Sequence, residues 1–290
     1  MTPITMEPLA DDASSPLPAS HLSLTRALDE KSMRMRSVRL VCISDTHSFE
    51  QDLTSRERGI GKGEANRRRN ADHTNSCSLP DGDVLIHGGD FVCDPRFDGR
   101  TVDQAQRSFD AWLATQPHKH KIVIAGNHDP PSAEWPCSGA IYAGGAPRSV
   151  EVEGVTLALV PYFREQFRKT KWVQGKPRVS VEKVRHKHFA LPRGEVLVTH
   201  SPPHRVLDRC GSGEHGGSTY LRALVQRAAV KPKLWLCGHI HESRGAACVR
   251  FGGGGGTADE RAAPTVVVNA SNANAGIARR CEHGAIVIDL

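Results

Sequence analysis

The sequence predicts an α/β domain, and three observations carry the prediction. Short apolar runs rich in β-branched residues recur along the chain, amphipathic helical patterns lie between them, and five of the runs end in Asp, Asn or His. Strands alternating with helices are typical of α/β folds. Runs that are apolar on both alternating positions indicate strands that are covered on both faces.

Eight runs are predicted to form strands. They cover residues 38–43, 84–87, 121–125, 155–160, 196–199, 234–237, 265–269 and 285–289. Two segments show apolar residues at steps of three and four, which predicts helices. The first contains Val102, Ala105, Phe109, Trp112 and Leu113, and the second contains Tyr220, Leu221, Leu224, Val225 and Ala228, with Ser218 placed to cap it.

The chain is predicted to divide into an N-terminal tail and one domain. Residues 1–36 are rich in Pro, Ser, Ala, Asp and Glu with weak periodicity, so we expect a flexible tail, and residues 37–290 form the domain. Within the domain, residues 51–80 have few apolar side chains and are expected to be an insertion loop. Residues 252–256 are five consecutive glycines and predict a second mobile loop.

Composition excludes several classes of protein. No run approaches the ~18 apolar residues that a membrane span needs, and the N-terminus lacks the pattern of a secretory signal, so a cytoplasmic protein is expected. The eight cysteines include no C-x-x-C pair, which excludes zinc-finger and thioredoxin motifs and favours reduced, buried thiols. A net charge of +6 suits a small phosphorylated substrate but predicts no specific nucleic-acid binding.

Polar residues follow five of the predicted strands directly. Ligand sites of α/β sheets lie at the carboxyl ends of strands, so these residues are expected to meet. The five blocks are Asp45-Thr46-His47, Gly89-Asp90, Gly126-Asn127-His128-Asp129, His200, and Gly238-His239-Ile240-His241.

The residue types in these blocks predict a metal centre. Carboxylate, amide and imidazole without thiolate suit Mn²⁺, Fe, Zn²⁺ or Mg²⁺. The set exceeds what one ion needs, and two ions sharing a carboxylate would use it in full, as in phosphoryl-transfer sites. The His-x-His pairs at residues 118–120 and 186–188 follow no apolar strand and are predicted to be solvated surface histidines. Asp129 and Glu242 either orient ligating imidazoles or act as caps or surface charges.

In these five blocks the chain resembles the calcineurin-like metallophosphoesterases, over about residues 37–290. Five segments resemble most the metallophosphoesterase-domain proteins related to the "239" brain proteins, a subfamily associated with hydrolysis of cyclic-nucleotide phosphodiesters. They are Ser44–Ser48, Leu85–Phe91, Thr199–Pro203, Gly238–Glu242 and Asn269–Ser271. The stretch 51–80 is longer than the subfamily's usual loop. Residues 90–96 lack the D-R-G pattern of protein Ser/Thr phosphatases, which argues against a phosphoprotein substrate.

The resemblance implies a four-layer α-β-β-α sandwich with two central mixed β-sheets and two divalent ions, Mn²⁺ first among them. Asp90 is expected to bridge the ions, and a hydroxide between them is expected to attack phosphorus. His128 is expected to face the substrate and donate a proton to the leaving group. The implied ligands are Asp45, His47, Asp90 and His241 for the first ion, and Asp90, Asn127, His200 and His239 for the second.

Three functions stay open at this point. The favoured function is hydrolysis of phosphodiesters, with small cyclic nucleotides as substrates. The first alternative is a phosphomonoesterase or a nuclease with the same metal site, although an aromatic content of 5% offers few stacking side chains for a nuclease. The second alternative is a non-catalytic scaffold of the same fold, which the five complete blocks disfavour. The oligomeric state is left open.

Overall fold

The computed structural model describes residues 21–23, 37–54, 79–163, 170–173, 176–179, 189–252, 263–275 and 280–290. Three predicted segments therefore lie largely outside the described residues. They are the tail at 1–36, apart from a strand at 21–23, the loop at 51–80, apart from its two ends, and the glycine run at 252–256, apart from Gly252.

Two six-stranded sheets form the centre of the fold. Sheet one has the order β1-β14-β2-β3-β4-β5, and sheet two has the order β12-β13-β11-β10-β7-β6. The strands of sheet one are β1 (His21–Ser23), β2 (Arg39–Ile43), β3 (Val84–His87), β4 (His120–Ile124), β5 (Ile141–Ala143) and β14 (Ile286–Asp289). Those of sheet two are β6 (Arg148–Val152), β7 (Val155–Val160), β10 (Val196–Thr199), β11 (Leu234–Cys237), β12 (Gly245–Val249) and β13 (Thr265–Asn269).

Both sheets are mixed. In sheet one only the β14–β2 pair is antiparallel, with Ile286 opposite Cys42, and in sheet two β12 and β6 run antiparallel to their neighbours. A separate antiparallel hairpin consists of β8 (Thr170–Val173) and β9 (Lys176–Val179). The helices are α1 (Gln51–Thr54), α2 (Pro95–Asp98), α3 (Val102–Ala114), α4 (Thr219–Arg227) and the short 3₁₀ helix η3 (His241–Ser243).

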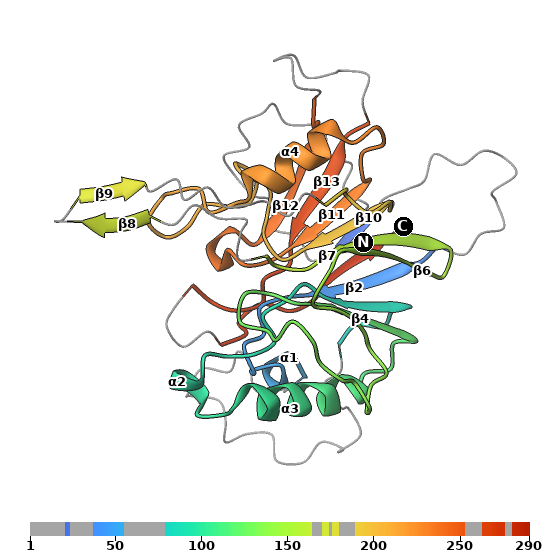
Figure 1. Cartoon of the computed structure of the whole chain (residues 1–290). Helices are drawn as coiled ribbons and strands as arrows, with labels where there is room; N and C mark the ends of the chain where they lie inside the picture. Colours follow the sequence, from blue (N-terminus) through green and yellow to red (C-terminus); the bar gives the residue numbers. More distant parts are fainter. Residues whose placement is uncertain are drawn as a thin grey trace, which may run out of the picture.

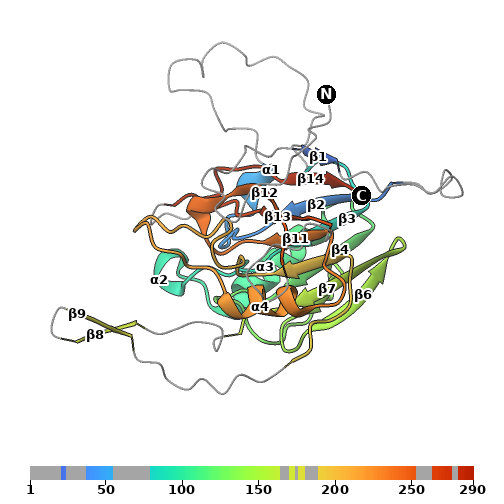
Figure 2. The same cartoon turned by 90° about the horizontal axis from the view of Figure 1, so that it is seen from above.

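The layers follow the order that the resemblance implied. Figure 1 shows α3 below sheet one and α4 above sheet two, with the two sheets packed face to face between them. The view from above in Figure 2 places β1 beside β14 at one edge of sheet one. The four-layer α-β-β-α sandwich with two mixed sheets is therefore confirmed.

Alternation along the strands builds the three apolar layers. In β2, Leu40 and Cys42 belong to the core between the two sheets. Val41 and Ile43 belong to the core between sheet one and α3. Trp235 and Cys237 of β11 likewise pack toward α4. Burial of both faces explains why these strands are almost continuously apolar in the sequence.

All eight predicted strands form, with ends that differ by at most one residue. Both predicted helices form as well, and Ser218 caps α4 by accepting a hydrogen bond from the Leu221 N–H at 3.1 Å. Strands β1, β5, β6, β8, β9 and β12 were not predicted. The edge strand β6 shows the reason, because its Arg148, Ser149 and Glu151 are exposed and give it no apolar run.

No helix among the described residues is both long and apolar enough to cross a membrane. Five of the cysteines within the described ranges are buried as predicted, but Cys137 is exposed and Cys210 is half-buried. Cys77 lies outside the described residues.

The packing between sheet one and α3 leads to a prediction about stability. Phe109 is 1% exposed, and its ring stacks on Phe91 with centroids 5.0 Å apart. Phe109→Ala should therefore cost about 3–5 kcal/mol of unfolding free energy through lost burial and a cavity. Thr101→Ala, which removes only the helix cap formed with Gln104, should cost about 1 kcal/mol. Urea denaturation measures both, and equal effects would contradict the proposed core.

Candidate metal centre

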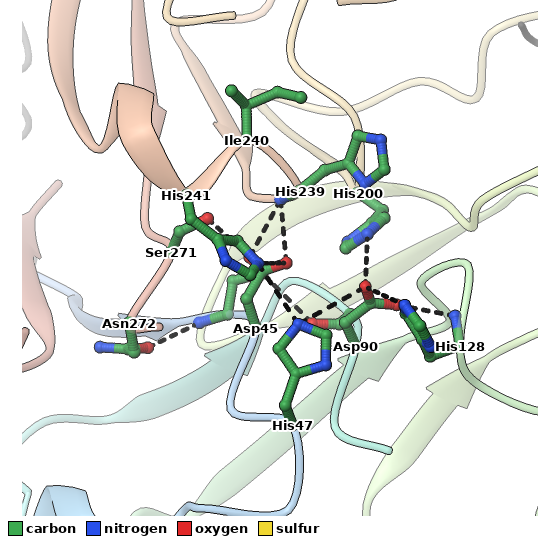
Figure 3. A network of polar contacts seen from close by, with 12 residues as sticks. Asp45, His47, Asp90, His128, His200, His239, Ile240, His241, Ser271 and Asn272 are labelled. Atoms are coloured by element: carbon green, nitrogen blue, oxygen red, sulfur yellow. Dashed lines mark hydrogen bonds and ion pairs between the residues drawn. The ribbon is translucent and has the colours of Figure 1, made fainter. Parts of the chain in front are cut away.

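The predicted site residues lie where the strands of both sheets end. Asp45 and His47 follow β2, Asp90 follows β3, and Asn127 follows β4, all in sheet one. His200 follows β10, and His239 and His241 follow β11, in sheet two. Figure 3 shows that these side chains, Asn127 aside, point toward one another from the two halves of the molecule. The site therefore exists only when the two sheets are packed together.

The loops that carry these residues adopt unusual backbone conformations. Four of these residues have positive φ angles, which are 56° at Asp45, 45° at His47, 59° at Asp90 and 70° at His239. Such conformations cost roughly 1–3 kcal/mol each and persist only where surrounding contacts impose them. Here the loops after β2 and β3 bond to each other, since Asp45 N–H donates to the Gly89 carbonyl at 2.9 Å and His47 N–H to the Asp90 carbonyl at 3.0 Å.

Two of the predicted glycines allow the loops to approach closely. A Cβ atom at Gly126 would collide with the side chain and backbone of Asp90. A Cβ at Gly238 would collide with the side chains of Ser44 and Asp45. Glycine is therefore required at both positions by the lack of space next to a site carboxylate.

Asp90 lies at the centre of the site. Its Oδ2 atom is 3.4 Å from Nε2 of His200, 3.9 Å from Nε2 of His47 and 3.9 Å from Nε2 of His128. Its Oδ1 atom accepts the His128 backbone N–H at 2.9 Å. One carboxylate oxygen thus faces imidazoles of both sheets, as a bridging ligand requires.

Two clusters of ligand atoms flank Asp90. The first contains Asp45, His47 and His241, with Nε2 of His241 3.4 Å from Oδ1 of Asp45 and 3.3 Å from Nε2 of His47. The second contains Asp90, His200 and His239. Asn127 joins it, because its Oδ1 is 3.1 Å from Nε2 of His200.

The orientation of the imidazoles fits metal ions. Three of the imidazoles have Nδ1 close to a backbone carbonyl. The distances are 3.3 Å from His47 to Val92, 2.8 Å from His200 to Gly88 and 3.1 Å from His241 to Asn274. A ring whose Nδ1–H donates to a carbonyl carries its lone pair on Nε2 when neutral. The three Nε2 atoms all face site carboxylates or each other. Lone pairs at these distances repel unless a proton or a metal ion lies between them, so the donor set fits the implied ion pair.

The site charges favour a cation. Burial alone raises the pKa of Asp45, but the hydrogen bond to His241 and the charges of His200 and the other histidines outweigh it, and the pKa lies well below its ordinary value. Burial disfavours a charged His200, but Asp90 and Asp45 outweigh it and raise the pKa of His200 to about 9. For His239, burial and the charge of His200 lower the pKa to about 4.

The exposure of His128 falls within the range of the predicted ligands. Its side chain is 23% exposed, against 1% and 0% for His47 and His200, but His239 and His241 are half-buried and Asn127 is exposed. Its ring lies near the metal clusters, because the ligand atoms of His47, Asp90 and His128 also form a group that could hold an ion. The position of His128 thus suits either a proton donor or an additional ligand, and its exposure does not decide between the two.

Several residues that support the site were not predicted. Ser271 donates to Asp45 Oδ2 at 2.7 Å, and Asn272 Oδ1 accepts the Ser44 N–H at 2.9 Å, both from the segment after β13. Tyr162 follows β7, and its ring centroid lies 5.9 Å from those of both His200 and His239. The strand runs before these residues were recognised, but hydroxyl and aromatic side chains after a strand do not by themselves indicate a metal site.

The residues flanking the blocks have mostly structural roles. Asp129 accepts backbone N–H groups of Asp90, Val92 and Gly126 at 2.7, 3.0 and 2.8 Å, so it fixes loops and no imidazole. Glu242 accepts the Gly211 N–H at 3.2 Å.

One prediction about the remaining histidines is wrong. His118 was expected at the surface but is 1% exposed, with Nε2 3.0 Å from the Pro80 carbonyl, because the turn after α3 folds its ring inward. His120 pairs with Glu153 at 2.7 Å at the surface. Residues 186 and 188 lie outside the described residues.

Comparison with known proteins identifies the family. Residues 38–243 match the model of the calcineurin-like phosphoesterase family. The chain belongs to this family. The matched range contains all seven predicted ligands and His128, and members of the family are metal-dependent phosphoesterases.

Individual relatives are moderately similar. The chain is 29% identical over 224 residues to UPF0046 protein K07C11.7 of Caenorhabditis elegans, covering 72% of this chain and 65% of the relative. It is 29% identical over 231 residues to UPF0046 protein C25E10.12 of the same organism, covering 72% and 70%. It is 28% identical over 238 residues to human metallophosphoesterase domain-containing protein 1, covering 71% and 61%. The resemblance to metallophosphoesterase-domain proteins is thus confirmed. The chain spans only about two thirds of the length of these relatives.

The raised pKa of His200 generates a pH prediction. In the metal-free protein His200 holds a proton below a pKa of about 9, and an ion that binds its Nε2 must displace that proton. The affinity for Mn²⁺ at the second cluster should therefore increase as the pH rises from 6 toward 9. Calorimetric titrations in buffers of different ionisation enthalpy should detect one proton released per ion at that cluster. Binding that is independent of pH would contradict the assignment of His200 as a ligand.

Proposed function

We propose that this phosphoesterase hydrolyses phosphodiester bonds of small nucleotides, cyclic nucleotides included, with two divalent ions. The observation that carries the proposal is the convergence of six other ligand side chains around Asp90, with the partly exposed His128 beside them. One ion would be held by Asp45, His47, Asp90 and His241. The other would be held by Asp90, Asn127, His200 and His239. This nitrogen and oxygen donor set suits Mn²⁺, Fe, Zn²⁺ or Mg²⁺, and Mn²⁺ is proposed first because of the family resemblance. The relatives named for a metallophosphoesterase domain support the same class of reaction.

When bound, the ions would neutralise the phosphoryl oxygens and lower the pKa of water for attack on phosphorus. The backbone N–H groups of Asp90 and Gly126 both donate to the Asp129 carboxylate. These hydrogen bonds hold the loops after β3 and β4 together and so fix Asp90 relative to His128. In the reaction a new P–O bond forms to the water oxygen, and the P–O bond to the leaving alkoxide breaks.

His128 is the proposed proton donor to that alkoxide. An unassisted alkoxide is a poor leaving group, and a positioned imidazolium contributes typically ~10²–10⁴-fold to the rate. The backbone of His128 is fixed by its N–H bond to Asp90 Oδ1 at 2.9 Å, while its ring is partly exposed to an incoming substrate.

A substrate panel tests the proposal. With Mn²⁺, bis(p-nitrophenyl) phosphate should be hydrolysed with higher kcat/KM than p-nitrophenyl phosphate, because the proposed site serves a diester and the chain lacks the D-R-G block. The panel should include 2′,3′- and 3′,5′-cyclic nucleotides. A clear preference for the monoester would favour the phosphomonoesterase alternative, and no hydrolysis in any metal would favour a scaffold.

Replacing His128 separates metal binding from proton transfer. His128→Ala should keep two ions per chain while kcat on a cyclic nucleotide falls by roughly 10²–10⁴-fold. The loss should be smaller for bis(p-nitrophenyl) phosphate, because p-nitrophenolate needs little protonation. Metal analysis and kinetics on both substrates check this. Loss of an ion in His128→Ala would instead identify His128 as a ligand.

A further inference from the structure

Ser271 holds Asp45 from the opposite sheet. Ser271 lies just beyond Ala270 at the end of β13 in sheet two, while Asp45 lies just beyond Ser44 at the end of β2 in sheet one. Its hydroxyl donates to Asp45 Oδ2 at 2.7 Å, and Figure 3 shows the two side chains meeting beside His241. Both residues are fully buried, so no water competes for this hydrogen bond.

The two oxygens of Asp45 have different surroundings. Oδ2 accepts the Ser271 hydroxyl and the His239 backbone N–H, the latter at 2.9 Å. Oδ1 lies 3.1 Å from the same N–H and 3.4 Å from Nε2 of His241, on the side of the first cluster. The hydroxyl therefore occupies Oδ2 and leaves Oδ1 as the oxygen that faces the cluster.

Ser271 itself cannot easily move. Its N–H donates to Asn269 Oδ1 at 3.1 Å, and its carbonyl accepts from Arg244 Nη1 at 2.8 Å. It forms a parallel bridge with Ser44, and the neighbouring Asn272 exchanges two hydrogen bonds with the Ser44 backbone, at 2.9 and 2.8 Å. The same segment continues to Asn274, whose carbonyl orients His241 at 3.1 Å.

From this geometry we propose that Ser271 is a positioning residue for the first metal cluster. It orients Asp45 to bind through Oδ1 alone, and it acts on the first ion and not on the second. The inference rests on the metal site of the proposed function, but it concerns only the protein side chains around Asp45. Hydrogen-bonding partners of metal ligands typically change metal affinity by ~10–100-fold when removed.

The test uses single-site backgrounds and no substrate. His200→Ala should leave the first cluster as the binding site, and His241→Ala should leave the second. Adding Ser271→Ala should weaken Mn²⁺ binding about 10–100-fold in the His200→Ala background and leave it unchanged in the His241→Ala background, measured by calorimetric titration of metal-free protein. Ser271→Thr keeps the hydroxyl and should restore much of the affinity.

Ser201→Ala is the matched control. Ser201 is 1% exposed and follows the ligand His200 directly, but its hydroxyl has no hydrogen-bond partner. Its removal should change neither affinity. Thermal unfolding of the metal-free variants checks that Ser271→Ala is folded.

Two results would overturn the inference: unchanged affinity in the His200→Ala background, or equal weakening in both backgrounds. If the single-site proteins bind too weakly to titrate, the metal content of Ser271→Ala after dialysis against limiting Mn²⁺ decides. One ion per chain supports the inference, and two or none contradicts it. None of these readouts depends on which phosphoester is the substrate, so a failed substrate panel leaves this test intact.

Discussion

The burial of two carboxylates, Asp45 and Asp90, is the constraint on which the rest of the structure depends. Their side chains are 0% and 3% exposed, and an uncompensated charge in such a place is strongly unfavourable. Compensation comes from imidazoles and hydrogen-bond donors that mostly belong to the other sheet, such as His200 and Ser271. The carboxylates therefore favour a tightly packed pair of sheets, and the packed sheets in turn hold the carboxylates at a fixed distance.

The same constraint explains why strained loops are stable here. Four predicted ligands have left-handed backbone conformations, which the sequence of each loop alone would not favour. They are imposed by bonds between loops, of which the three backbone groups held by Asp129 are an example. A metal pair would add to this, because binding to preformed ligands stabilises the folded state relative to the unfolded chain.

Sequence reasoning located the central strands and the residues that converge at the candidate site for a common physical reason. Strands covered on both faces must be apolar throughout, so a polar residue directly after one, such as Asp45 or His200, is conspicuous. Edge strands such as β6 lack that signal because one side faces water. Ser271 could not be assigned a role because a serine after a strand is ordinary, and its partner Asp45 is 226 positions away. His118 was misjudged because its lysine neighbours suggested exposure, while burial depends on how the turn after α3 folds back.

Exposure does not by itself separate the proposed metal ligands from the residue proposed to meet a substrate. His47 and His200 are buried in the frame between the sheets, but the proposed ligand Asn127 is exposed. Asn127 and its neighbour His128 both lie in the loop after β4, so a single loop would contribute a metal ligand and the proposed proton donor. In the proposed function, a change in that loop would therefore alter both metal binding and proton transfer, whereas the buried ligands would act on the substrate through the metal ions.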